Sequence, residues 1–177
     1  QLTAVTRELL TRFPDYRLDV YPTHRTVTMP QPFQDNTLKN ATGARSVDDG
    51  LGMENALPGI PFPIPKTGAE AMWNHAMRYN GEAIRVRYDS WNVDAAGTPV
   101  LASPGTALIQ YPLIDPAHFN VPASPTEVFT LFKLYYSGPT RRVGEALMVH
   151  DSVNPALQPR RAWQYLPGQR RVKLAPD

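Results

Sequence analysis

The chain has 177 residues, of which 42 % are hydrophobic and 19 % charged, and its formal net charge is +2. This composition is typical of a globular protein and argues against wholesale disorder, and the near-neutral charge gives no reason to expect a nucleic-acid partner. The absence of cysteine excludes disulfides, thiolate metal sites and cysteine nucleophiles. No apolar run approaches the roughly 20 residues that span a bilayer. We expect one domain over residues 1–177.

The first third of the chain alternates between helical and extended patterns. Apolar residues at helical spacing predict an amphipathic helix over residues 2–13, which Pro14 ends. Residues 16–29 alternate apolar and polar side chains, which predicts two extended strands. Asp35 is placed to cap a short helix that runs through Ala44. Residues 47–59 read as a loop, which is either a lid or binding loop or a solvated connection.

A proline-rich segment precedes a second helix signal. Pro61, Pro63 and Pro65 occupy every second position, so residues 60–65 must be extended but cannot form a central strand. This rigidity lowers the entropy lost when Phe62 and Ile64 are laid against the fold. Thr67 and Glu70 form a capping box that predicts a helix to about Asn80, stopped by Gly81.

The rest of the chain has the period of two that is typical of strands. We predict strands over residues 82–93, 98–113, 126–137, 141–150, 160–166 and 170–175. Pro167 and Gly168 suit the central positions of a type II turn between the last two. The predicted fold is α+β: one curved antiparallel sheet, an open and unclosed β-barrel, with helices packed on or in its concave face.

The sequence gives no positive signal for catalysis. It contains none of the nucleophile-elbow, P-loop or dinucleotide-binding motifs. Its four histidines do not pair at a metal-binding spacing. We therefore expect no enzyme activity, no catalytic or metal-binding residue and no cofactor.

Large apolar side chains are the most suggestive feature for binding. The flexible thioether of methionine suits a site that repacks around varied apolar ligands, although most of these residues are equally expected in an ordinary core. The candidates for ligand binding are Phe62, Met72, Trp73, Met77, Phe132, Tyr135 and Trp163.

Basic residues gather near the end of the chain. Arg160, Arg161, Arg170 and Arg171 lie on two arms of one predicted hairpin, interleaved with aromatic residues. A nucleic-acid surface has this pattern, and so does the solvated face of an amphipathic hairpin, which the near-neutral charge favours. An acidic partner surface or lipid head groups are a third reading. We take these arginines as candidates for partner binding.

Two stretches resemble a known bacterial family. GIPFPIPKTGAEAMWNHAMRYNG and the C-terminal GEALMVHDSVNPALQPRRAWQYLPGQRRVKLAPD resemble the family called domain of unknown function 1329, whose members are often labelled outer-membrane lipoprotein-sorting proteins. The likeness covers nearly the whole chain, and WQYLPGQRRVKLAP is its most specific part. The last stretch is also similar to lipoprotein carriers, which fold as an open β-barrel that encloses helices.

The resemblance implies a periplasmic protein whose chain continues beyond Asp177, in a pathway that handles hydrophobic molecules beside outer-membrane proteins or export pumps. We expect a carrier or chaperone for a lipid-like ligand or lipoprotein, peripheral to the membrane at most. The alternative is a structural adaptor that docks an outer-membrane or export-pump partner without a ligand.

Overall fold

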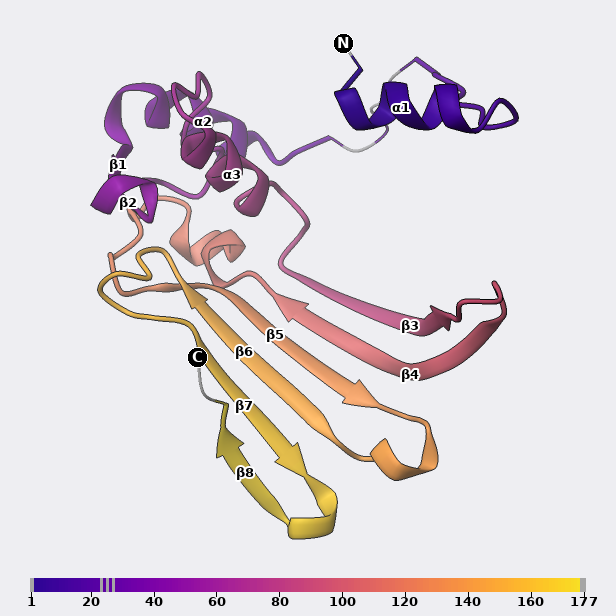
Figure 1. The fold of residues 1–177 in the computed structure, drawn as a ribbon. Helices are drawn as coiled ribbons and strands as arrows, with labels where there is room; N and C mark the ends of the chain where they lie inside the picture. The colour runs from indigo at the N-terminus through magenta and orange to yellow at the C-terminus, as the bar shows by residue number, and fades with distance from the viewer. Residues whose placement is uncertain (1, 23, 25, 27, 176–177) are drawn as a thin grey trace.

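A six-stranded antiparallel sheet forms the larger part of the molecule (Figure 1). The computed structural model describes residues 2–22, 24, 26 and 28–175. The strands follow one another in space as in the chain, and the sheet does not close on itself. They are β3 (Ala83–Val93), β4 (Pro99–Gln110), β5 (Val128–Tyr136), β6 (Ala146–Ser152), β7 (Arg161–Leu166) and β8 (Arg171–Leu174). This confirms the predicted α+β fold with an open antiparallel sheet.

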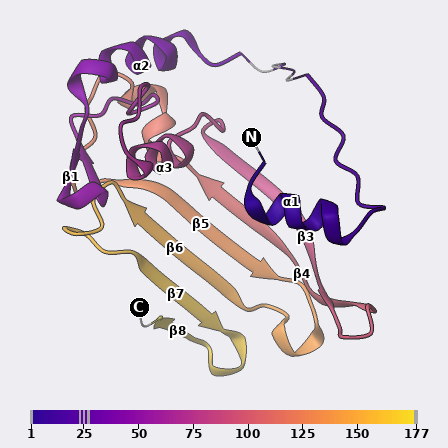
Figure 2. The same cartoon turned by 45° about the horizontal axis from the view of Figure 1, so that its top comes forward.

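The helices lie on one side of this sheet. They are α1 (Ala4–Arg12), α2 (Gln31–Gly43) and α3 (Gly68–Ala76), and a small hairpin of β1 (Arg45–Val47) and β2 (Gly52–Glu54) lies beside α2 and α3. α2 and α3 gather over one end of the sheet, and Figure 2 draws α1 in front of β3 and β4. α1 has no buried residue, whereas α2 and α3 contribute to the core.

The hydrophobic core lies between α3, the β1–β2 hairpin and the loops at the sheet's helix end. Its buried members are Met53, Ala56, Phe62, Trp73, Met77, Leu113, Ala123 and Val153. Phe129 on β5 packs against this cluster, with its ring 5.5 Å from that of Trp73. The pairing of β5 with β6 shifts register between Val128 and Thr130, so Phe129 is the extra residue of a β-bulge, which re-aims its side chain.

Asparagine side chains hold the proline-rich segment. Asn40 donates to the carbonyl oxygens of Leu57 and Ile60 and accepts from the Leu57 N–H. Asn74 bonds both the N–H and the carbonyl of Phe62. These bonds replace the ladder that prolines cannot join. The segment forms no strand, as predicted, but bends at Pro61, Pro63 and Ile64 interrupt the extended course that was expected. Phe62 is buried at 7 % exposure, but Ile64 is 81 % exposed, so the prediction that Ile64 packs on the fold was wrong.

Several N-terminal predictions need correction. Among the described residues of 16–29 no strand forms, because no partner strand lies beside them, and Val27 lies outside the described residues. α2 begins at Gln31, with proline in its first turn, and Asp35 lies inside it and accepts a hydrogen bond from Gln31. Residues 47–59 contain β2 and are not one loop.

Two later boundaries also differ. α3 has the predicted Thr67 cap, but it ends at Ala76 because Met77 leaves helical geometry where it turns into the core. Between the paired Leu166 and Arg171, the chain forms a 3-10 turn over Pro167–Gln169, and the positive φ of 49° falls on Arg170. The predicted type II turn was wrong because a four-residue connection favours a turn of type I geometry.

Candidate functional site

The side of the sheet that faces α3 carries an apolar surface, which we call the concave floor. Side chains alternate along each strand, so residues paired in register across strands share a face. One such row runs from β3 to β6 through Ile84, Ile109, Phe132 and Val149, and the next through Val86, Ala107, Leu134 and Leu147. A cavity of about 510 Å³ between α3 and the sheet is lined by side chains of the first row. The floor therefore lies on the helix side.

Most of the concave floor lies outside the buried core. Of its side chains only Ala107 is buried, and Val86 is 42 % exposed. Because α3 and the loops around it cover one end of the sheet, the remaining aliphatic surface is only partly covered. β3 and β4 curve toward the helix side at their far end, so the sheet is curved rather than flat (Figure 1).

A groove runs along α3 at the near end of the floor. A second cavity, of about 400 Å³, lies beside the first, and both are lined by Ala76, Phe129, Asp151 and Arg160. Arg160 donates to both carboxylate oxygens of Asp151, at 2.6 and 3.1 Å. Hydrogen bonding to Asp151 and its charge raise the pKa of Arg160 above the ordinary value. An ion pair therefore marks the mouth of an otherwise largely apolar groove.

Tyrosines close the far end of the floor. Tyr136 lies under the Arg142 guanidinium, whose carbon is 3.7 Å from the ring centroid, and Arg142 also pairs with Glu145 at 3.1 Å. The Tyr88 hydroxyl is buried and has no hydrogen-bond partner among the described residues. Burial raises the pKa of Tyr88. Its ring lies over Gly105, where an added Cβ would collide with the Tyr135 carbonyl oxygen, so the close approach requires glycine.

Comparison with known proteins places the chain in a family. The family model described as "Protein of unknown function (DUF1329)" matches residues 1–177. The chain belongs to the DUF1329 family. Uncharacterized protein PA3922 of Pseudomonas aeruginosa is 37 % identical over 179 residues, which cover 100 % of this chain and 38 % of that protein. The chain thus spans well under half of that relative's length. No solved structure matches it.

The predicted ligand residues of this DUF1329 chain lie in four places. Phe62, Trp73 and Met77 are core residues, although Trp73 also lines the groove and donates its indole N–H to the Gly50 carbonyl at 3.0 Å. Met72 is 65 % exposed and lines the same groove. Phe132 lies on the concave floor.

The other two predicted ligand residues lie on the opposite face of the sheet. Tyr135 and Trp163 share the register of side chains that point away from α3. Trp163 packs edge-to-face on His150, with ring centroids 4.7 Å apart. The structure therefore brings Met72, Trp73 and Phe132 to one side of the sheet and separates Tyr135 and Trp163 from them.

The four predicted partner arginines are all exposed but do not form one cluster. Arg160 lies at the groove mouth, and Arg161 begins β7 on the face away from α3. Arg170 and Arg171 lie at the β7–β8 turn, five residues along the strand from Arg161, or about 16 Å.

The aliphatic floor residues on β4 and β6 were not among the predicted site residues. The alternation of Ile84, Val86 and Tyr88 was visible in the sequence. Which residues lie beside them on the neighbouring strand depends on the pairing register, which the sequence does not reveal. Within the described part of the chain, no three histidine or carboxylate side chains are arranged to hold a metal ion, and no helix there has the length and apolarity to cross a membrane.

Proposed function

We propose that this DUF1329 chain carries a hydrophobic, lipid-like ligand on its concave floor, without covalent chemistry. The observation that carries the proposal is the position of the floor: rows of aliphatic and aromatic side chains lie on the helix side but outside the buried core. A sheet face of this kind usually packs against another layer. A ligand that covers the floor would take the place of that layer.

The floor has the size of an acyl chain. It crosses from β3 to β6, which is about 14 Å at the spacing of neighbouring strands, and extends about 13 Å along β5 from Phe132 to Tyr136. One leaflet of a bilayer holds about 15 Å of hydrocarbon. Burial contributes about 0.8 kcal/mol per methylene, so about 12 methylenes offset the cost of association. We therefore expect affinity to rise with chain length.

The proposed setting is the periplasm, where a lipid-like molecule or a lipoprotein must cross an aqueous space between membranes. A carrier needs no covalent chemistry for this task. It has only to bury the apolar part of the ligand away from water until a partner receives it. The partner would be an outer-membrane protein or an export pump, and the carrier would be peripheral to the membrane at most. These assignments follow the resemblance to lipoprotein carriers.

Two neighbouring residues of β5 give a matched test, because Leu134 points to the concave floor and Tyr135 away from it. We expect Leu134→Gln to weaken binding of an uncharged fluorescent acyl probe by about ten-fold, since it places an amide in the apolar floor. Tyr135→Gln should change the affinity by less than about two-fold. Equal effects of the two variants, or no probe binding by the unaltered protein, would contradict the proposal.

The alternative function is that of an adaptor without a ligand, and the observation that favours it is the β7–β8 hairpin. All four residues of β8 are exposed, and the strand pairs only with β7 among the described residues. The edge of β8 with which no described strand pairs, together with the exposed Arg170 and Arg171, would bind an acidic edge strand of a partner. Under this alternative, charge reversal at both arginines abolishes capture of an envelope partner, and Leu134→Gln has no effect.

A further inference from the structure

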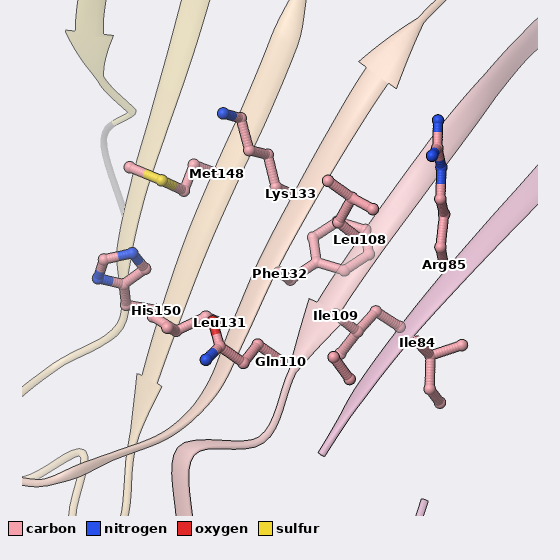
Figure 3. Close-up of a pocket in the computed structure, with 11 residues that line it drawn as sticks. Ile84, Arg85, Leu108, Ile109, Gln110, Leu131, Phe132, Lys133, Met148 and His150 are labelled. Carbon is pink, nitrogen blue, oxygen red and sulfur yellow. The ribbon is translucent and has the colours of Figure 1, made fainter. Parts of the chain in front are cut away.

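A third cavity lies on the face of the sheet that points away from α3, which we call the outer face. The outer cavity has a volume of about 490 Å³ (Figure 3). Its floor is formed by Leu108, Leu131 and Met148 from three adjacent strands. Residues that pair with these three in register also line the cavity. Because its lining residues come from all four strands β3–β6, the cavity is a shallow depression across the sheet.

Two cations flank the apolar part of the outer cavity. Arg85, Leu108 and Lys133 are paired in one row across β3, β4 and β5, so the two cations stand on either side of Leu108, about 10 Å apart at the backbone (Figure 3). Neither forms an ion pair with any described residue. The lining residues include no carboxylate. A low-dielectric wall beside uncompensated cations favours an anion.

The polar groups at the other end of the cavity are neutral or basic. His150 is held against the Trp163 ring, and Gln110 lies in the same row, with Leu131 between them. The Lys133 ammonium lies 4.8 Å from the Tyr135 ring centroid, which keeps it on the outer face. The cavity thus joins an apolar bed to a cationic rim, the arrangement that matches an apolar chain with an anionic head.

We propose that the outer cavity binds a single-chain anionic amphiphile, an alkyl carboxylate or an alkyl phosphate. The chain would lie over Leu108, Leu131 and Met148, and the head group would lie between Arg85 and Lys133. The site lies on the other face of the sheet from the concave floor, and it shares with the floor only Ile84, Ile109 and Phe132, which also line the outer cavity. This proposal does not depend on whether the concave floor carries a ligand.

The test is calorimetric titration of the intact protein with dodecanoate and with dodecyl phosphate, each below its micelle concentration, beside dodecanol and dodecyltrimethylammonium. The variant Arg85→Gln/Lys133→Gln removes the cationic rim. The variant Arg87→Gln/Arg161→Gln removes equal charge from the outer face, but from residues that do not line the cavity. Arg85, Arg87 and Arg161 are exposed and Lys133 is half-buried, so we expect both double variants to fold. Circular dichroism of the two variants checks this.

We expect the rim variant to bind the two anionic amphiphiles about ten-fold more weakly, and the control variant to bind them within about two-fold of the unaltered protein. Dodecanol and the cationic amphiphile should bind more weakly than either anion. Comparison of dodecanoate with dodecyl phosphate distinguishes the two head groups. An equal loss in both variants would mean general charge attraction, and a loss confined to Leu134→Gln would place binding on the concave floor; either result overturns the proposal.

Discussion

At the scale of single residues, the asparagines of α2 and α3 decide how the proline-rich segment is held. A segment with alternating prolines has few N–H donors, and its carbonyl oxygens cannot join a sheet ladder. Asn36 donates to the carbonyl oxygens of Pro58 and Phe119, and Asn40 and Asn74 bond Leu57, Ile60 and Phe62. Gly59 allows this close approach, because an added Cβ would lie 2.8 Å from the Thr37 nitrogen.

Asn40→Ala should therefore destabilise the fold by about 2–3 kcal/mol, since Leu57 and Ile60 lose their partners in a partly buried site. The measurement is the free energy of unfolding in urea. Lys39→Ala, an exposed change on the same helix, serves as the control and should lie within about 0.5 kcal/mol of the unaltered protein. Equal stability of the two variants would show that the asparagine bonds contribute little.

At the scale of elements, the strands were predictable because each combines a period of two with clear turn residues. β3, β4, β5, β7 and β8 fall within their predicted ranges, whereas β6 begins at Ala146, five residues later than predicted, because residues 140–142 form a 3-10 turn. The N-terminal strands were mispredicted because alternation alone gives a strand only where a partner lies beside it. β1 and β2 are too short, at three residues each, for a pattern to identify them.

The candidate site was predictable only in part, because the register of the strands decides which face of the sheet each side chain occupies. Met72 and Trp73 were expected to point inward from the capped helix; Trp73 does, but Met72 is 65 % exposed, so that half of the prediction was wrong. Tyr135 and Trp163 were grouped with them because size and apolarity do not reveal which face a strand residue occupies. The bulge at Phe129 changes the alternation locally, and the position of α3 decides which face is covered.

The capping box of α3 gives an element-scale prediction. The Thr67 hydroxyl accepts from the Glu70 N–H at 3.2 Å, and the Glu70 carboxylate accepts from the Lys66 N–H. Thr67→Ala should cost about 1 kcal/mol of stability, measured by thermal or urea unfolding, and Thr67→Asn should restore most of it because asparagine also caps helices well. If both variants are equally destabilised, the cap is not the cause.

At the scale of the whole molecule, the core and the apolar concave floor are in different places. The core joins α3 to the strand ends, while the concave floor extends beyond it toward the far tyrosines. Since the chain spans 38 % of the length of its relative from Pseudomonas aeruginosa, the activity of the whole protein is a proposal that rests on this part. The division between a packed end and an open apolar sheet is what a carrier requires.

The most direct test of that account is native mass spectrometry of the intact protein, purified without detergent from cells that naturally make it. We predict a bound hydrophobic molecule that organic solvent extracts, and its loss from the Leu134→Gln variant but not from Tyr135→Gln. A protein that is free of ligand in every preparation and that ignores added fatty-acid probes would contradict the account.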